Sequence, residues 1–229
     1  MRVTPIELGT VQLPDWHPRA AGGTCPIRVF AVEHPDGVML VDTGPADDHE
    51  TINEWYAPDV RPIVTALNAA GIDERDVAAI VNSHLHFDHC GQNSALPRVP
   101  VWVQREEVAA AEAPHYTVAE WAAIAPERAR ILDGDAELAA GVTILSTPGH
   151  TPGHQSVLVD ADGRRELIVG QACYLCSDFE EAVVPSDNLH DESWADTAAA
   201  SIRRLVAVGA DAAHFSHDLR MYARDGQGV

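Results

Sequence analysis

A strong negative charge limits what this chain of 229 residues can bind. With 35 acidic residues against 15 basic ones, its formal charge of −20 argues against nucleic acid and anionic membranes as partners. Hydrophobic residues at 46% and charged residues at 22% are typical of a folded globular protein, and the length favours a single domain over residues 1–229.

No apolar run approaches the length of a transmembrane helix, and the first residues lack the apolar core of a signal peptide, so we expect a cytoplasmic location. Four cysteines are too few for a disulfide framework in a chain of this length. Cys173 and Cys176 have CxxC spacing, which fits either a redox pair or two half-buried thiols beside a site. We favour the second interpretation.

The first 45 residues have the pattern of short β-strands. Ile27–Val32 and Val38–Val41 flank the segment His34–Gly37, in which proline fixes φ and glycine accepts a positive φ, as a tight turn requires. The second strand runs directly into the polar loop Asp42–Gly44. A helical pattern then covers residues 60–70, with a proline near its first turn and a glycine just past its end.

The apolar strand Val77–Val81 leads into the most informative stretch of the chain. His84, His86, Asp88 and His89 follow it within six residues. Imidazole nitrogen and carboxylate oxygen are ligands that zinc and similar first-row metals accept. A loop that is merely rich in histidine is the alternative, and it is weakened because four such groups would repel or compete unless something bound them.

The segment after this cluster is predicted to contain the strand Pro100–Gln104 and the helix Arg105–Glu112. Thr117–Glu120 has the pattern of a capping box and predicts a second helix through Trp121. The region 105–130 is interpreted equally well as plain packing and as a lid that faces a substrate.

The second half begins with the strand Val142–Ser146, which runs into Thr147–His150. Two further strands, Ser156–Val159 and Glu166–Val169, form a hairpin that echoes the N-terminal one. A last strand, Ala212–Ser216, ends directly before His217.

Between these strands, Asp191–Val208 has the clearest amphipathic pattern, and Gly209 is expected to end the helix. One stripe of this helix is predicted to pack on the core. It consists of Trp194, Ala198, Ile202, Leu205 and Val206.

Strands followed by helices, twice over, predict two sheets packed face to face with helices outside. His150 and His217 each follow a strand, as the histidine cluster does, and strand ends at one rim converge. We therefore predict two metal-binding groups. His84, His86 and His150 form the first, and Asp88, His89 and His217 form the second.

Together these residues resemble the metallo-β-lactamase superfamily, whose HxHxDH signature lies here at His84–His89. The resemblance covers nearly the whole chain and is strongest to the N-acyl homoserine lactonase group. It implies an α+β fold, namely an αββα sandwich of two mixed β-sheets with helices on the outer faces, and a metal-dependent hydrolase. The segments that carry it are Asp42–Gly44, Ser83–His89, Val101–Glu107, Thr147–Ser156 and Phe215–Asp218.

One position departs from the family pattern. Gln171 stands where the family has an aspartate that bridges both metals, and Tyr174 matches a tyrosine that contacts the substrate in this group. Glutamine keeps one acceptor oxygen but lacks the negative charge. We therefore expect the second ion to bind more weakly. A weakly bridged dinuclear site, a site with one tight metal and a site that has lost hydrolysis are the three alternatives, of which we favour the first two.

The resemblance implies a quorum-quenching enzyme that opens a lactone of the N-acyl homoserine lactone type by attack of a metal-bound hydroxide. Asp88 is then a candidate for passing a proton to the leaving alkoxide, and Tyr174 for donating a hydrogen bond to the carbonyl oxygen. The alternatives are pure metal ligation for Asp88 and packing for Tyr174. Asp42 and His154 are expected to support ligands and loops rather than to bind metal.

Two other functions remain open. One is hydrolysis of another small cyclic ester, amide or thioester. The other is a non-hydrolytic metal-dependent lyase or isomerase, or a binding protein, on the same fold. It is an alternative because Gln171 replaces the bridging aspartate. One or two zinc ions are expected, and the ligands also accept iron, manganese or cobalt. The sequence does not distinguish a monomer from a homodimer. Acyl-chain preference is expected to depend on the loops at residues 10–24 and 105–130.

Overall fold

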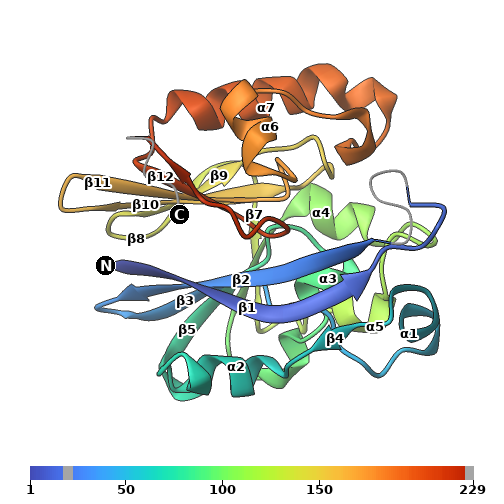
Figure 1. The fold of residues 1–229 in the computed structure, drawn as a ribbon. Coiled ribbons are helices and arrows are strands. Elements are labelled where there is room, and N and C mark those ends of the chain that lie inside the picture. Colours follow the sequence, from blue (N-terminus) through green and yellow to red (C-terminus); the bar gives the residue numbers. More distant parts are fainter. Residues whose placement is uncertain (18–22, 225–229) are drawn as a thin grey trace.

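Two β-sheets face each other across the core, and helices cover their outer sides (Figure 1). The computed structural model describes residues 1–17 and 23–224, so part of the 10–24 segment lies outside the described residues. This architecture is the predicted αββα sandwich. Across the described residues, no helix combines the length and the apolar character that crossing a membrane would need.

The first sheet has seven strands in the spatial order β4-β1-β2-β3-β5-β6-β7. They are β1 (Arg2–Gln12), β2 (Thr24–His34), β3 (Gly37–Val41), β4 (Asp59–Val60), β5 (Val77–Val81), β6 (Val101–Gln104) and β7 (Ala129–Leu132).

The second sheet has six strands in the order β13-β12-β11-β10-β9-β8. They are β8 (Ala136–Ala139), β9 (Val142–Ser146), β10 (Gln155–Ala161), β11 (Arg164–Gly170), β12 (Ala212–Phe215) and β13 (Tyr222–Ala223).

The helices form two outer layers and a group at one end of the sandwich. In Figure 1, α2 lies on the outer side of the first sheet and α6 and α7 on that of the second, whereas α1, α3, α4 and α5 gather at one end. Their bounds are α1 (Glu50–Tyr56), α2 (Ile63–Ala69), α3 (Phe87–Cys90), α4 (Arg105–Ala110), α5 (Ala119–Ala122), α6 (Cys176–Glu181) and α7 (Ala195–Ala207).

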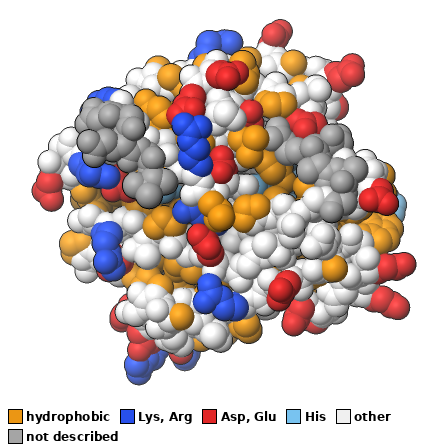
Figure 2. Space-filling model, in the orientation of Figure 1, with side chains coloured by type: hydrophobic (Ala, Val, Ile, Leu, Met, Phe, Trp, Pro, Cys, Tyr) orange, Lys and Arg blue, Asp and Glu red, His pale blue; other side chains and the backbone are white. Residues whose placement is uncertain are grey.

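Each sheet is buried on both faces, which explains why β3 and β5 are apolar without interruption. Phe30 and Ile168 belong to the cluster between the two sheets. A second cluster packs the first sheet against α2, and a third packs Phe215 of the second sheet against α7. On the face shown in Figure 2, acidic side chains are dispersed rather than gathered into one patch.

The two halves repeat one arrangement. The hairpin β2–β3 is antiparallel and β3 then pairs in parallel with β5; likewise β10–β11 is antiparallel and β11 pairs in parallel with β12. Parallel neighbours end at the same edge of a sheet, so the polar segments after β3 and β5, and those after β11 and β12, leave their sheets together. These segments build the site.

Several predicted boundaries differ from the structure. The helix predicted over residues 60–70 is α2, and it begins at Ile63 rather than Val60 because Val60 belongs to β4 and pairs with Gly9 of β1. The predicted capping box at Thr117–Glu120 is wrong: α5 begins at Ala119, and its N-cap residue makes no side-chain capping bond. None of the four cysteines forms a disulfide, and Cys173 and Cys176 are fully buried rather than half-buried as expected.

The long helix also starts later than predicted. Asp191 caps a short 3₁₀ turn by accepting a hydrogen bond from the Ser193 backbone nitrogen at 2.8 Å, and α7 follows from Ala195. Of the predicted stripe, Leu205 is fully buried, but Val206 is 40% exposed. The helix turns by about 100° per residue, so these neighbours cannot both face the sheet.

This pair gives a direct test of how α7 packs. Leu205→Ala should lower the free energy of unfolding by about 2–5 kcal/mol, because it removes buried methyl groups and leaves a cavity. Val206→Ala, on the exposed side, should change it by less than about 0.5 kcal/mol. Urea denaturation followed by circular dichroism measures both, and equal losses would contradict the packing described here.

Candidate metal centre

The polar segments that follow five strands meet at one end of the sandwich. β9 and β11 both run antiparallel to β10, and β11 runs parallel to β12. The strands β9, β11 and β12 therefore all end at the same edge of the sheet. The edges of the two sheets are joined there, because the Gln155 backbone nitrogen donates to the Ser83 carbonyl at 2.8 Å and that of Arg28 to the Ser216 carbonyl at 3.0 Å. Side chains from distant parts of the sequence therefore meet.

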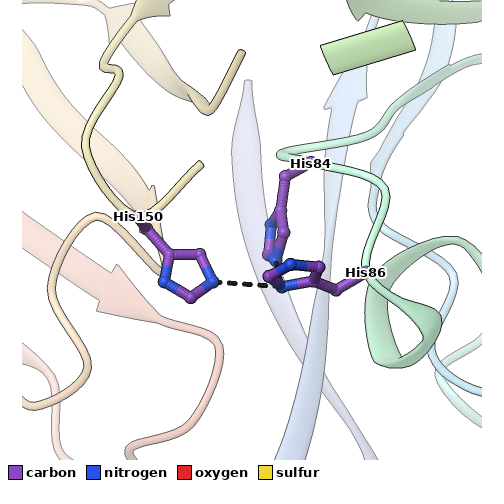
Figure 3. Close-up of side chains that lie close together, drawn as sticks. All are labelled: His84, His86 and His150. Atoms are coloured by element: carbon purple, nitrogen blue, oxygen red, sulfur yellow. Dashed lines mark hydrogen bonds between the residues drawn. The ribbon is translucent and has the colours of Figure 1, made fainter. Parts of the chain in front are cut away.

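The first group consists of His84, His86 and His150. The Nδ1 atom of His86 lies 3.0 Å from Nε2 of His84 and 3.2 Å from Nε2 of His150. Figure 3 shows the three rings pointing toward one another, His84 and His86 from one loop and His150 from the opposite one. This is the first group expected from the sequence, and its ligand atoms all lie within 4.8 Å of one another.

The second group consists of Asp88, His89 and His217. The Nε2 atoms of the two histidines are 3.2 Å apart, and the Asp88 carboxylate lies 3.6 Å from that of His89 and 3.5 Å from that of His217. The short helix α3 supplies the turn that separates Asp88 and His89 from the extended residues before them. It directs them to the second group rather than to the first.

Second ring nitrogens of the histidines are engaged by the protein. In His84, His89, His150 and His217 the Nδ1 atom has a polar partner, which leaves Nε2 directed into its group. A hydrogen bond at one ring nitrogen fixes ring orientation and which nitrogen is free to ligate. Nδ1 of His84 lies 3.0 Å from Ser83 Oγ, and Nδ1 of His89 lies 2.8 Å from Asp42 Oδ2. Nδ1 of His150 lies 3.2 Å from the Asn188 carbonyl, and Nδ1 of His217 lies 3.0 Å from the Pro26 carbonyl.

Asp42, the partner of His89, has an unusual backbone conformation. Its backbone has a φ of 64°, in the left-handed region that few non-glycine residues adopt. Its carboxylate accepts hydrogen bonds from both the backbone nitrogen and the hydroxyl of Ser83, each at 2.7 Å, as well as contacting His89. Asp42 thus supports His89, the role that its place after a strand predicted.

Burial sets the charge state of the first group. Loss of water lowers the pKa of His84 and His150 well below the usual value, and neighbouring imidazoles lower it further. Burial also lowers the pKa of His86 to about 4. For Asp88, burial alone would raise the pKa, but the imidazoles of His89 and His217 hold it below its ordinary value. The neutral imidazoles of the first group and the ionised Asp88 are in the forms that bind metal.

Gln171 lies within the second group, directly after β11. Its Oε1 atom is 3.0 Å from Nε2 of His89 and 3.1 Å from Nε2 of His217. Its backbone is held on both sides: the nitrogen donates to Nε2 of His154 at 3.1 Å, and the carbonyl accepts from Asn188 at 2.9 Å. The amide oxygen therefore occupies a defined place among the ligands.

His154 supports a loop, as the sequence analysis expected. Because its Nε2 accepts from a backbone N–H, its Nδ1 carries the proton and donates to the Thr147 hydroxyl 2.9 Å away. Burial lowers the pKa of His154 to about 3, which keeps the ring neutral for this role.

Tyr174 stacks on His217 with ring centroids 4.8 Å apart, and its hydroxyl lies 3.2 Å from the Cys25 sulfur. Both residues line a cavity of about 540 Å³ that also reaches His86 and Asp88. Residues 115–120 form part of its wall, so the region 105–130 does face this space.

The donors present fit a pair of metal ions. Five imidazoles and one carboxylate, grouped three and three, are the nitrogen-rich ligands that first-row divalent metals accept. Three protein donors in each group would leave room for water or substrate on a bound ion, as catalytic rather than structural sites do, and His86, His150 and Asp88 line the cavity. Gln171 is the weak member of the set, because an amide oxygen carries no charge.

The model of the metallo-beta-lactamase superfamily matches residues 22–217. The chain belongs to this superfamily. It is 34% identical to the N-acyl homoserine lactonase of Bacillus cereus over 197 residues, which cover 80% of this chain and 76% of that protein. It is 30% identical to the N-acyl homoserine lactonase AttM of Rhizobium radiobacter over 187 residues, 70% of each chain.

Solved structures agree with this relationship. An N-acyl homoserine lactone hydrolase with the product N-hexanoyl-L-homoserine bound at its catalytic metal centre is similar with a TM-score of 0.77 and 30% identity, over 95% of this chain and 93% of that one. A Bacillus thuringiensis relative with N-decanoyl-L-homoserine bound at its active site has a TM-score of 0.78 and 29% identity.

Three supporting residues were not singled out in the sequence. Ser83 contacts both Asp42 and His84, Asn188 contacts His150 and Gln171, and Cys25 contacts Tyr174. Only Ser83 carried a local signal, since it precedes the histidine cluster directly. Asn188 and Cys25 are distant in sequence and reach the site through the fold.

Asp42 offers a test of this support. Asp42→Asn should weaken metal binding at the His89 group by about 10–100-fold, because the amide is a poorer partner for the His89 ring. Competition with a chromogenic chelator measures the affinity. Asp47→Asn, at an exposed position five residues away, is the matched control and should bind as the unaltered protein does. Equal affinity in the two variants would contradict the role of Asp42.

Proposed function

We propose that this protein is a metal-dependent hydrolase that opens a lactone of the N-acyl homoserine lactone type. The observation that carries the proposal is the placement of both ligand groups, Gln171 and Tyr174 on one cavity. The relatives named above support the substrate class, because their own names and bound products are of this type.

The cavity suits a small neutral molecule with an apolar tail. One wall of the cavity carries aromatic rings. The ring of Trp16 packs edge-on against those of Trp55 and Tyr56, with centroids 6.0 and 6.2 Å apart. The centroids of the Tyr56 and Phe87 rings are 4.5 Å apart. Trp16 and Trp55 are 62% and 50% exposed, which is costly for large apolar side chains unless a ligand covers them. Among the described residues that line the cavity, none is an arginine or a lysine, and Asp88, Glu120 and Asp187 are acidic, so the cavity does not favour an anionic substrate.

A metal bound at these groups would supply a water nucleophile of lowered pKa and would polarise the ester carbonyl. Asp88 is ionised and borders the cavity, so its carboxylate accepts a proton from the nucleophile and passes it to the leaving alkoxide. Tyr174 stacks on His217 and forms part of the cavity wall, and its role in the proposal is to donate a hydrogen bond to the carbonyl oxygen as negative charge develops there.

Zinc is the metal we propose, since imidazole-rich groups of three are typical of catalytic zinc sites. The cytoplasm is the proposed location, and a small molecule is the proposed partner. Gln171 favours one second candidate. Without a bridging carboxylate, the site is also suited to another cyclic ester, amide or thioester whose hydrolysis needs one tightly held ion.

The proposal is tested by loading purified protein with zinc and measuring acid release from a panel of lactones and linear esters. We expect N-acyl homoserine lactones to be opened and to gain the mass of one water, because the cavity combines an apolar wall with the ligand groups. Protein that holds metal yet opens no lactone in the panel would overturn the proposal.

Gln171 itself predicts how the metals bind. Gln171→Asp should tighten the second metal by at least about tenfold, because a carboxylate offsets the repulsion between two dications and an amide does not. Gln171→Asn is the matched control, since it has the same size as the aspartate variant without its charge. Stoichiometry by elemental analysis and affinity by calorimetry measure the effect. If both variants bind alike, the assignment of this position is wrong.

A further inference from the structure

Glu107, on α4, is a charged residue that the proposed chemistry does not use. Its side chain is fully buried. A buried carboxylate is costly unless hydrogen bonds satisfy its oxygens, so the partners of Glu107 show what it holds in place. It lies in the strand-to-helix segment after β6, away from both ligand groups in sequence.

Both carboxylate oxygens are saturated by donors from other loops. Oε1 accepts from the Leu85 backbone nitrogen at 2.8 Å and from the Tyr116 hydroxyl. Oε2 accepts from the Thr151 hydroxyl at 2.7 Å and from the Gly153 backbone nitrogen at 3.1 Å. Four donors converge on one carboxylate.

These donors belong to the loops that carry the first ligand group. Leu85 lies between His84 and His86, and Thr151 directly follows His150. Each oxygen of Glu107 therefore binds one of the two loops that supply the three imidazoles. The His84 and His86 loop and the His150 loop come from different sheets, and no single backbone ladder fixes their spacing.

Tyr116 extends the connection to the cavity. Its ring centroid lies 4.8 Å from that of His86, and it lines the cavity wall. Burial and the nearby Glu107 carboxylate raise the pKa of the Tyr116 hydroxyl, so it stays protonated and donates to Glu107. One carboxylate thus contacts both ligand loops and the wall against which a substrate would lie.

A neutral amide cannot replace this carboxylate. Each oxygen faces one backbone N–H, from Leu85 or from Gly153, and a backbone N–H cannot reverse its role. A glutamine at position 107 would turn its NH₂ group toward one of them in either orientation. The fit is also tight, because a Cβ on Gly153 would lie 2.2 Å from the Glu107 backbone nitrogen.

We propose that Glu107 is the positioning residue that holds His84, His86 and His150 at metal-binding distance from one another and ties them to the cavity wall. It acts through the loops and touches neither metal nor substrate. The inference rests on the proposed function only in that the three histidines bind a metal. The second group has its own buried support in Asp42, so Glu107 should act on the first group selectively.

Cobalt(II) titration of metal-free protein tests the selectivity, because cobalt absorption reports the ligands and geometry of each group. His150→Ala and His217→Ala provide reference spectra for protein with only one intact group. Glu107→Gln is the test variant. Glu106→Gln is its matched control, since it makes the same change at the exposed neighbouring position on α4.

In Glu107→Gln we expect cobalt affinity of the three-histidine group to fall by about 10–100-fold, with the second group changed by less than about threefold. Glu106→Gln should match the unaltered protein. A residue that only stabilises the fold would lower thermal stability of the metal-free protein and weaken both groups equally. That outcome, or unaltered affinity at the three-histidine group, would overturn the proposal.

Thr151→Val keeps the test decisive if Glu107→Gln does not fold. It removes one donor to Glu107, leaves the carboxylate in place and should weaken the same group selectively by a smaller factor. Equal effects on both groups, or none, would count against Glu107 here too. The readout needs no lactone, so a chain that failed to hydrolyse lactones would still confirm or refute the role of Glu107.

Discussion

The structure depends on holding five imidazoles and several carboxylates close together out of water. Such groups repel or compete when empty, and burial removes the solvent that would screen them. The chain meets this constraint by giving ring nitrogens directed away from the centre a fixed partner. Asp42 holds His89, main-chain carbonyls hold His150 and His217, and the free nitrogens are left facing one another.

The two-sheet sandwich brings these side chains together without long loops. Each sheet ends a parallel pair at the same edge, so short loops suffice to bring the ligands together from residues far apart in the chain. Buried carboxylates then join the loops. Asp42 connects the end of β3 to the segment after β5, and Glu107 connects that segment to the loop after β9. The apolar interior fixes the sheets, and these two side chains fix the loops.

Gln171 sets the charge of the centre. Without an aspartate at this position, Asp88 is the carboxylate among the assigned ligands, and the first group carries no charge of its own. Two dications bound side by side would therefore repel more strongly than in a site with a bridging carboxylate. The amide oxygen of Gln171 lies 3.0 Å from Nε2 of His89 and 3.1 Å from Nε2 of His217, so an uncharged acceptor occupies this place between the two rings.

The sequence alone determined the superfamily, the two-sheet architecture and which side chains cluster in the two candidate ligand groups. It did so because the histidine cluster is local, and because apolar strands followed directly by polar residues place those residues at sheet edges. Strand β5 and strand β9 were predicted to the residue. The start of α7 and the lack of a capping box at α5 were not predicted. Packing against neighbouring segments decides where these helices begin.

The tertiary structure alone decided which buried groups support the ligands. Glu107 ends a segment that carries the family resemblance, yet nothing in that segment indicates which loops its carboxylate joins, and Cys25 and Asn188 carry no local pattern. Their roles arise from contacts with Leu85, Tyr174 and Gln171 across long stretches of chain. A hydrogen bond between distant residues has no periodicity in the sequence, so only the folded chain shows it.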